Sequence, residues 1–307
     1  MAPAVKEPTV WRNATGVVRA PWKVAVFGVA VAVTAVAAGG LALGVLAGSP
    51  LGTLARVARI PLDQIASLGA MLAATWIATR VLVGDGRGAW AYSALGKGAW
   101  APARVAVAAF AGVWVVAMPI GLMLLARIMG MEPATAADSW AMTAWAAFAL
   151  MVPAALAEEL LFRGYAFTAI CESSGDWAAI GVTSVLFGAA HLFNPDPSVV
   201  STVAVMAAGV FLSIVRVTTG SLVAAWAAHV GINFAQAVFF HAPVSGIALG
   251  TPGYRLTEKG PAWLTGGGWG PEGGAAVVGG MTVASFLYLW WRRWRDARTA
   301  ASSTTIP

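Results

Sequence analysis

The stretch "AEELLFRGY", Ala157–Tyr165, places two adjacent glutamates and an arginine inside a segment that is otherwise apolar. A charged side chain at the centre of a bilayer costs roughly 2.5–3.5 kcal/mol on insertion scales. Charged residues inside membrane helices therefore face the interior of a helix bundle or a water-filled cavity, and they have partners there. If the surrounding chain spans a membrane, this stretch predicts an enclosed polar site.

The composition is that of a membrane protein. Of the 307 residues, 59% are hydrophobic and only 10% are charged, whereas soluble domains carry about 25% charged residues. The 15 tryptophans fit an interfacial aromatic belt, and the single cysteine, Cys171, excludes an intramolecular disulfide. The net charge of +6 gathers at segment ends and at the C-terminus. In these places positive charge sets the topology and gives no nucleic-acid signal; the partner expected of such a chain is membrane lipid.

Eight apolar segments come close to the roughly 17–25 residues that a spanning helix needs. They predict an all-α fold, a polytopic integral membrane helix bundle of about eight transmembrane helices, with residues 1–307 as a single membrane domain. Lys and Arg concentrate on one side of these spans, which predicts cytoplasmic N- and C-termini. The segments are Trp22–Ala47, Ile65–Val83, Val105–Met129, Trp140–Thr168, Trp177–Phe193, Val199–Val215, Leu222–Phe240 and Ala275–Trp291.

Three further regions stand out along the chain. Residues 140–241 hold most of the polar side chains that lie within spans, so this region is the predicted catalytic core. Residues 244–274 form a Gly-rich extramembrane loop. Loops of that length are often lids, binding loops or disordered segments, and a flexible connector between two spans is the interpretation we favour. Residues 292–307 are a basic polar tail.

Helix geometry assigns different roles to the charges of the opening stretch. Glu159 and Arg163 are four residues apart, so they share a face, and the glutamate precedes the cation, which is the favoured order. They are predicted to form a supporting intrahelical pair that needs no catalytic role. Glu158 lies about 100° around the helix and has no such partner in its own helix. Its partners are therefore expected on other helices.

The candidate partners are two histidines and an asparagine. His191 ends the sequence "FGAAH" in the fifth segment, and His229 and Asn233 share a helix face in the seventh, in "AAHVGIN". If these faces converge, Glu158 and His191 hold a water molecule, with Glu158 as the general base. His229 and Asn233 then donate hydrogen bonds to a developing oxyanion. Together these groups predict a peptide hydrolase, whereas His241 is expected at the membrane interface.

In these residues the chain resembles the CPBP intramembrane proteases, which include type II CAAX prenyl endopeptidases and bacteriocin-processing and immunity proteins. The family pattern is EExxxR, then FxxxH, then HxxxN or HxxxD, and it is matched in order by Glu158–Arg163, Phe187–His191 and His229–Asn233. The Gly-Tyr that follows the arginine is also present, as Gly164–Tyr165. The resemblance covers residues 140–241.

The resemblance implies an intramembrane endopeptidase that hydrolyses a peptide or protein substrate entering from the membrane, either prenylated or a small peptide. It implies that Glu158 and His191 activate water, and that His229 and Asn233 bind the oxyanion. Glu159 and Arg163 match the family's supporting pair.

Two alternatives remain open at the level of sequence. Glu158, His191 and His229 could equally ligate Zn²⁺ and leave a position open for water, although no HExxH motif is present. The cofactor is therefore either none or zinc, and we favour the metal-independent glutamate mechanism. The same buried polar cluster would also serve a transporter, or a non-catalytic scaffold or immunity protein that binds a peptide or ion. The chain lacks paired interrupted helices in two halves, which argues against a transporter.

Overall fold

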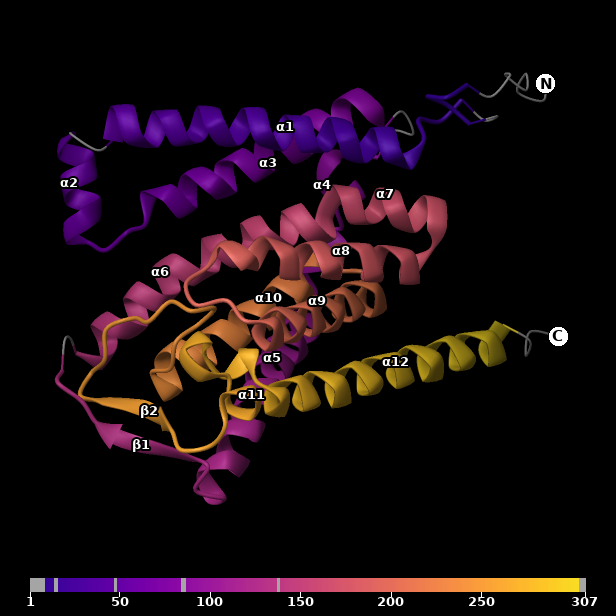
Figure 1. Cartoon of the computed structure of the whole chain (residues 1–307). Coiled ribbons are helices and arrows are strands. Elements are labelled where there is room, and N and C mark those ends of the chain that lie inside the picture. Colours follow the sequence, from indigo (N-terminus) through magenta and orange to yellow (C-terminus); the bar gives the residue numbers. More distant parts are fainter. Residues whose placement is uncertain (1–8, 14–15, 47–48, 84–86, 137–138, 304–307) are drawn as a thin grey trace. The chain divides into compact units, whose positions relative to one another are not determined.

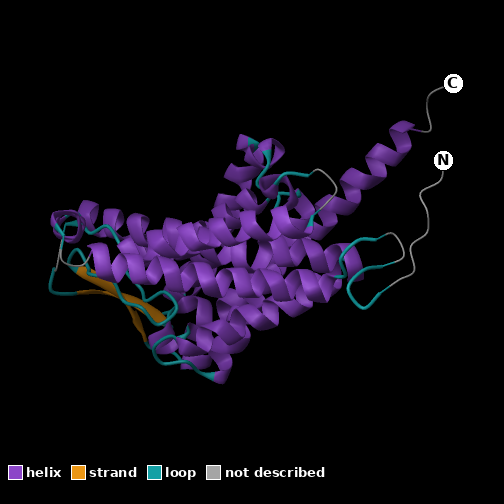
Figure 2. Ribbon diagram, turned by 90° about the horizontal axis from the view of Figure 1, so that it is seen from above, coloured by secondary structure: helices purple, strands orange, loops and turns teal. Residues whose placement is uncertain are grey.

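The computed structural model describes residues 9–13, 16–46, 49–83, 87–136 and 139–303. The chain forms two compact units, each built from two separate stretches of sequence. Unit 1 comprises Met1–Trp100 and Phe148–Thr183, and unit 2 comprises Ala101–Ala147 and Ser184–Pro307. Helices make up most of the described residues of both units, and unit 2 also holds a pair of strands (Figures 1 and 2).

The elements have the following bounds. The helical elements wholly within unit 1 are α1 (Ala20–Leu41), η1 (Ala42–Leu46), α2 (Pro50–Val57), α3 (Leu62–Leu82), α4 (Ala89–Tyr92), η2 (Lys97–Trp100), η3 (Leu160–Gly164) and α7 (Tyr165–Ser174). The elements wholly within unit 2 are α5 (Pro102–Leu125), β1 (Met129–Pro133), η4 (His191–Phe193), α9 (Val199–Thr219), α10 (Leu222–Phe234), η5 (Ala235–Phe240), β2 (Tyr254–Glu258), α11 (Ala262–Thr265), η6 (Gly267–Trp269), η7 (Pro271–Gly273) and α12 (Ala275–Ser303). The borders between the units fall inside α6 (Trp140–Glu159) and α8 (Asp176–Ala190).

The predicted all-α, polytopic membrane fold is confirmed. Among the described residues, seven helical stretches are long and apolar enough to cross a membrane, and they correspond to the first seven segments expected from the sequence. The eighth expected segment forms the first part of α12, a continuous helix of 29 residues that is not among the seven. Its apolar part runs into an arginine-rich second half. The seven stretches are Ala20–Gly44, Leu62–Leu82, Pro102–Leu125, Trp140–Ser174, Asp176–Phe193, Val199–Thr219 and Leu222–Phe240.

Unit 1 is organised around the tyrosine that ends the opening stretch. Helices α1 and α3 lie side by side, and α7 packs on α1 (Figure 1). The Tyr165 ring is fully buried, and its centroid lies 5.2 Å from that of Phe27 and 5.1 Å from that of Tyr92. Lys23 and Tyr92 both bind Glu172 Oε2, at 3.3 and 3.0 Å. These contacts bury the start of α7 in the core of the unit and tie its exposed end to Lys23 and Tyr92.

The sequence "RVTTGSL", Arg216–Leu222, forms the corner between α9 and α10. Gly220 ends α9 in the left-handed region, with φ of 65°, a conformation that glycine adopts without the penalty of a Cβ. Ser221 then begins α10, and its side chain accepts a hydrogen bond of 3.0 Å from the Ala224 N–H, as an N-cap does. The two helices are therefore joined by a minimal turn and pack against each other.

Helix α10, which carries two of the candidate site residues, crosses α5 at two glycines. A Cβ at Gly112 of α5 would overlap the backbone oxygen of Ala228, and a Cβ at Gly231 of α10 would meet the backbone oxygen of Ala109 at 2.5 Å. Small residues allow membrane helices to approach this closely. Because Gly231 lies between His229 and Asn233, this crossing fixes the depth and rotation of the helix turn that bears them.

The Gly-rich segment 244–274, which the sequence suggested is a connector, contains a strand and three short helices. Strand β2 pairs antiparallel with β1, from Met129 opposite Glu258 to Pro133 opposite Tyr254. The short helices α11, η6 and η7 then lead into α12. The sequence "YRLTE", in which Tyr and Thr are good strand formers, is a signal for this strand that the prediction of helices missed.

Replacing Gly112 with alanine tests the close crossing. We expect Gly112→Ala to lower the free energy of unfolding by about 1–3 kcal/mol, because α10 must move to admit the methyl group. The matched control is Gly121→Ala on the same helix, where a Cβ meets nothing within 4 Å. This control should be neutral, or stabilising by up to about 1 kcal/mol. Thermal unfolding of both purified variants provides the measurement, and equal shifts would contradict the crossing.

Candidate active site

The first part of the candidate site lies where α6 gives way to a π turn. Helix α6 ends at Glu159, η3 continues as a π-helix through Leu160–Gly164, and α7 resumes at Tyr165. The Arg163 guanidinium donates to Glu159 Oε1 over 3.1 Å, and both side chains are 0% exposed. The predicted intrahelical pair is therefore present. Single π turns occur frequently at functional sites.

The π turn corrects one expectation about Glu158. Arg163 interacts electrostatically with both glutamates, most strongly with Glu159 and next with Glu158. A π turn brings residue i+5 over residue i, so the same cation can act on both carboxylates. The expectation that Glu158 lacks a counter-charge within its own helix is thus wrong. Glu158 is half-buried, whereas Glu159 is fully buried.

The second part of the candidate site lies at the end of α8, in unit 2. His191 is half-buried, and its Nδ1 lies 2.8 Å from the backbone oxygen of Phe187. A carbonyl oxygen can only accept a hydrogen bond, so Nδ1 must carry the proton. In the neutral ring, Nε2 then holds the lone pair. A histidine fixed in this way can accept a proton or bind a metal through Nε2.

Phe187 also brings the two motif histidines into one part of unit 2. Its buried ring lies 4.5 Å from the His191 ring and 5.9 Å from the His229 ring, which it meets edge-on. His229 is 6% exposed on α10, and Asn233 lies one turn further along that helix, half-buried. The predicted approach of the fifth and seventh segments is therefore seen at the two histidines.

The candidate metal ligands are Glu158, His191 and His229, of which the glutamate belongs to unit 1 and the histidines to unit 2. Two imidazoles and a carboxylate are a donor set that Zn²⁺ takes with one position left open. The bond from His191 Nδ1 to a backbone carbonyl is of the kind that orients a ligating histidine. Among the described residues, no group of three His, Cys, Asp or Glu side chains is placed to hold a metal ion.

Sequence reasoning missed a further carboxylate beside His229. Glu272 of η7 is 4% exposed. Its Oε1 accepts hydrogen bonds from the Ser245 N–H at 2.5 Å and from Ser245 Oγ at 2.9 Å. Its own N–H donates to Gln236 Oε1 over 3.0 Å, and Gln236 lies on η5, a π turn that follows α10. The only signal in the sequence was a lone acidic residue among glycines, in "GPEGG".

Burial raises the pKa of Glu272 to about 7, although the hydrogen bonds from Ser245, the contact with Gln236 and the nearby His229 all act to lower it. Oε2 is buried and has no hydrogen-bond partner among the described residues. The 244–274 segment therefore places a carboxyl group next to the candidate oxyanion site. His241 is also buried in unit 2. Its Nε2 lies 3.1 Å from the hydroxyl oxygen of Tyr254 on β2.

A double-mutant cycle tests the buried ion pair. Arg163→Met leaves two glutamates without their cation, and we expect it to lower the free energy of unfolding by about 3–5 kcal/mol. Glu159→Gln should cost less, because Glu158 still acts on Arg163. The double variant Glu159→Gln with Arg163→Met combines the two single changes and should be more stable than Arg163→Met alone, since no buried charge of the pair remains. Unfolding in detergent provides all three values, and simple additivity would contradict a coupled pair.

The raised pKa of Glu272 predicts that the stability of the 244–274 segment depends on pH. A carboxyl whose folded-state pKa is raised stabilises the folded state at low pH, and that stability is lost as the pH rises from about 4.5 to about 7. Hydrogen exchange in residues 244–274, corrected for the intrinsic rate, should therefore increase between pH 5 and pH 8. Glu272→Gln keeps an acceptor for Ser245 but does not titrate, so its corrected exchange should not vary. The same pH dependence in both proteins would contradict this assignment.

One part of the chain is similar to a known protein family. Residues 140–235 match the family model of the type II CAAX prenyl endopeptidases, Rce1-like. No curated protein and no solved structure matches the chain significantly. The matched stretch contains all three motifs, from Glu158 to Asn233. The match agrees with the resemblance seen in the sequence, over residues 140–235, and the matched family is one of membrane CAAX-type endopeptidases.

Proposed function

We propose that the chain is an intramembrane endopeptidase that hydrolyses a peptide bond of a membrane-associated substrate. In this proposal Glu158 and His191 activate water, and His229 and Asn233 stabilise the oxyanion. Glu159 and Arg163 hold the turn that carries Glu158. The substrate is a peptide or protein that enters from the membrane, and a prenylated C-terminus and a small peptide both fit the chemistry.

One observation supports the proposal most directly, namely the hydrogen bond from His191 Nδ1 to the backbone oxygen of Phe187. A general base or a metal ligand requires a defined tautomer, because its reactive nitrogen must carry a lone pair. The Phe187 ring that contacts His191 also contacts His229. His191, which is proposed to activate water, and His229, which is proposed to bind the oxyanion, therefore pack against the same side chain.

The proposed reaction is a simple hydrolysis. Glu158 accepts a proton from water, with His191 orienting that water, while the water oxygen forms a bond to the carbonyl carbon. The carbonyl π electrons move to the oxygen, where hydrogen bonds from His229 and Asn233 stabilise the charge. The C–N bond then breaks, and the proton held by Glu158 passes to the leaving amine. The carboxylate of Glu158 is regenerated, and no co-reactant other than water is consumed.

Glu158→Gln is the decisive variant. It preserves the shape of the side chain and removes the base, so we expect cleavage of a peptide panel to fall by about 10²–10⁴-fold. The panel should pair prenylated and unprenylated forms of the same peptides. Glu132→Gln is the matched control, because Glu132 is an exposed carboxylate, 3.7 Å from Lys259, outside the motifs. Retained cleavage by a folded Glu158→Gln protein would overturn the catalytic role and leave a binding function.

The same assay with chelator separates the two mechanisms. We favour the glutamate mechanism, in which cleavage survives removal of divalent metal. Loss of cleavage with chelator and its recovery with Zn²⁺ would instead make Glu158, His191 and His229 the ligands of a catalytic metal.

A further inference from the structure

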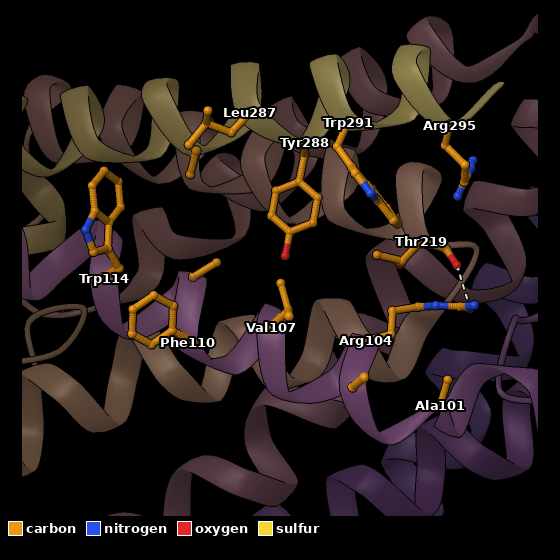
Figure 3. Close-up of a pocket in the computed structure, with 13 residues that line it drawn as sticks. Ala101, Arg104, Val107, Phe110, Trp114, Thr219, Leu287, Tyr288, Trp291 and Arg295 are labelled. Carbon is orange, nitrogen blue, oxygen red and sulfur yellow. Dashed lines mark hydrogen bonds between the residues drawn. The ribbon is translucent and has the colours of Figure 1, made fainter. Parts of the chain in front are cut away.

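A pocket of about 790 Å³ lies in unit 2, between α5, α12 and the end of α9 (Figure 3). It contains no residue of the three motifs, and its volume is typical of sites for small organic ligands. Most of its wall is apolar, with Phe110 and Trp114 from α5 facing Leu287 from α12. Phe110 is 68% exposed and Leu287 56% exposed, so the pocket is open along the surface that these helices present.

One end of the pocket is strongly basic. Arg104 donates to the backbone oxygen of Thr219 over 2.9 Å, and Arg295 donates to that of Thr218 over 3.1 Å. These carbonyls belong to the last turn of α9, where cations are favoured in any case, so capping this helix is one role of the two arginines. A guanidinium has five N–H donors. The bond to a helix-end carbonyl orients each guanidinium at this end of the pocket and uses one of these donors.

Arg295 has two other neighbours at this end. Its guanidinium lies 5.1 Å from the centre of the Trp291 ring. It also donates from Nε and Nη2 to Asp296 Oδ1, at 3.3 and 3.2 Å, and the Asp296 side chain is 58% exposed. Exposed ion pairs of this kind contribute little to stability. A ligand phosphate could therefore take over the contact that Asp296 makes.

A hydroxyl group in the middle of the pocket points to a ligand independently of the arginines. Tyr288 is 8% exposed, and its oxygen is buried without a hydrogen-bond partner among the described residues. Figure 3 shows this hydroxyl directed into the pocket, between the arginine end and the apolar end. Burial of a hydroxyl without a partner is unfavourable, so the position calls for a hydrogen-bond acceptor that lies inside the pocket.

We propose that this pocket is a binding site for an anionic diacyl phospholipid. The phosphate binds between Arg104 and Arg295, an ester carbonyl accepts the hydrogen bond of Tyr288, and the acyl chains lie along the apolar wall. The ligand must have its negative charge at one end, an acceptor next to it and a long apolar remainder, and a phospholipid has these groups in that order. Basic pockets between membrane helices bind anionic head groups in this way. The proposal does not depend on peptidase activity.

Lipid retention measures the site directly. The full chain is purified with an equimolar mixture of phosphatidylglycerol and phosphatidylcholine of identical acyl chains, and the bound lipid is counted by native mass spectrometry. We expect the wild type to retain phosphatidylglycerol preferentially. Arg104→Gln with Arg295→Gln should reduce that preference about tenfold or more. Arg293→Gln is the matched control, because it removes the same charge from α12 and Arg293 does not line the pocket.

Two further variants keep the proposal testable if the double variant does not fold. Asp296→Asn frees Arg295 from its carboxylate and should increase retention of phosphatidylglycerol, by about two- to fivefold. Tyr288→Phe removes only the hydroxyl and should reduce retention of both ester lipids by about two- to tenfold. The proposal is overturned if wild type shows no preference, if Arg293→Gln weakens the preference as much as the pocket variants do, or if Asp296→Asn and Tyr288→Phe have no effect.

Discussion

The buried pair of Glu159 and Arg163 is the constraint on which the first half of the candidate site depends. Two fully buried charges are tolerated in an apolar helix only because they are 3.1 Å apart and because each supplies the charge that the other needs. A π turn that directly follows Glu159 contains Arg163, and the next residue is Tyr165, whose ring is buried in the core of unit 1. Glu158 is therefore presented from a rigid support, within the field of the same arginine.

Two of the three motif-bearing helices, α6 and α10, share a second feature. Helix α6 becomes a π turn directly after Glu159, and α10 becomes a π turn two residues after Asn233. A π turn adds a residue to the helical circuit and rotates every side chain that follows. In α10 the rotation places Gln236 fully inside unit 2, where it accepts a hydrogen bond from the backbone of Glu272. The irregular helix thereby ties the ordered 244–274 segment to the residues of the candidate oxyanion site.

The sequence predicted the features that follow from local periodicity. The length of the apolar segments predicted the spans, and the i,i+4 spacing predicted the ion pair of Glu159 with Arg163. The order of the motifs predicted that His191 and His229 lie near each other. The π turns could not be predicted, because a helical pattern of 3.6 residues says nothing about one inserted residue. That omission led directly to the wrong statement that Glu158 lacks a counter-charge in its own helix.

Features that depend on distant parts of the chain were also missed. The 244–274 segment was interpreted as a connector because glycine-rich sequences favour flexible loops. Its structure depends on residues elsewhere in the chain, through the pairing of β2 with β1 and the burial of Glu272. The hydrogen bond from His191 Nδ1 likewise depends on the direction of the Phe187 carbonyl, which residue types do not reveal.

The pairing of β1 with β2 has a consequence for how the protein is made. The bonded residues Gly130 and Thr257 are 127 positions apart, and α5 is synthesised long before the Gly231 that it needs as a partner. During translation, β1 is therefore made before its partner strand β2, and the Gly112 face of α5 is made before α10 can pack on it. Unit 2 cannot complete its fold until nearly the whole chain has left the ribosome. Late closure of this kind favours slow folding and exposes unpaired surface to misassembly. The insertion machinery or the lipid must protect the early helices of unit 2 until its C-terminal elements arrive.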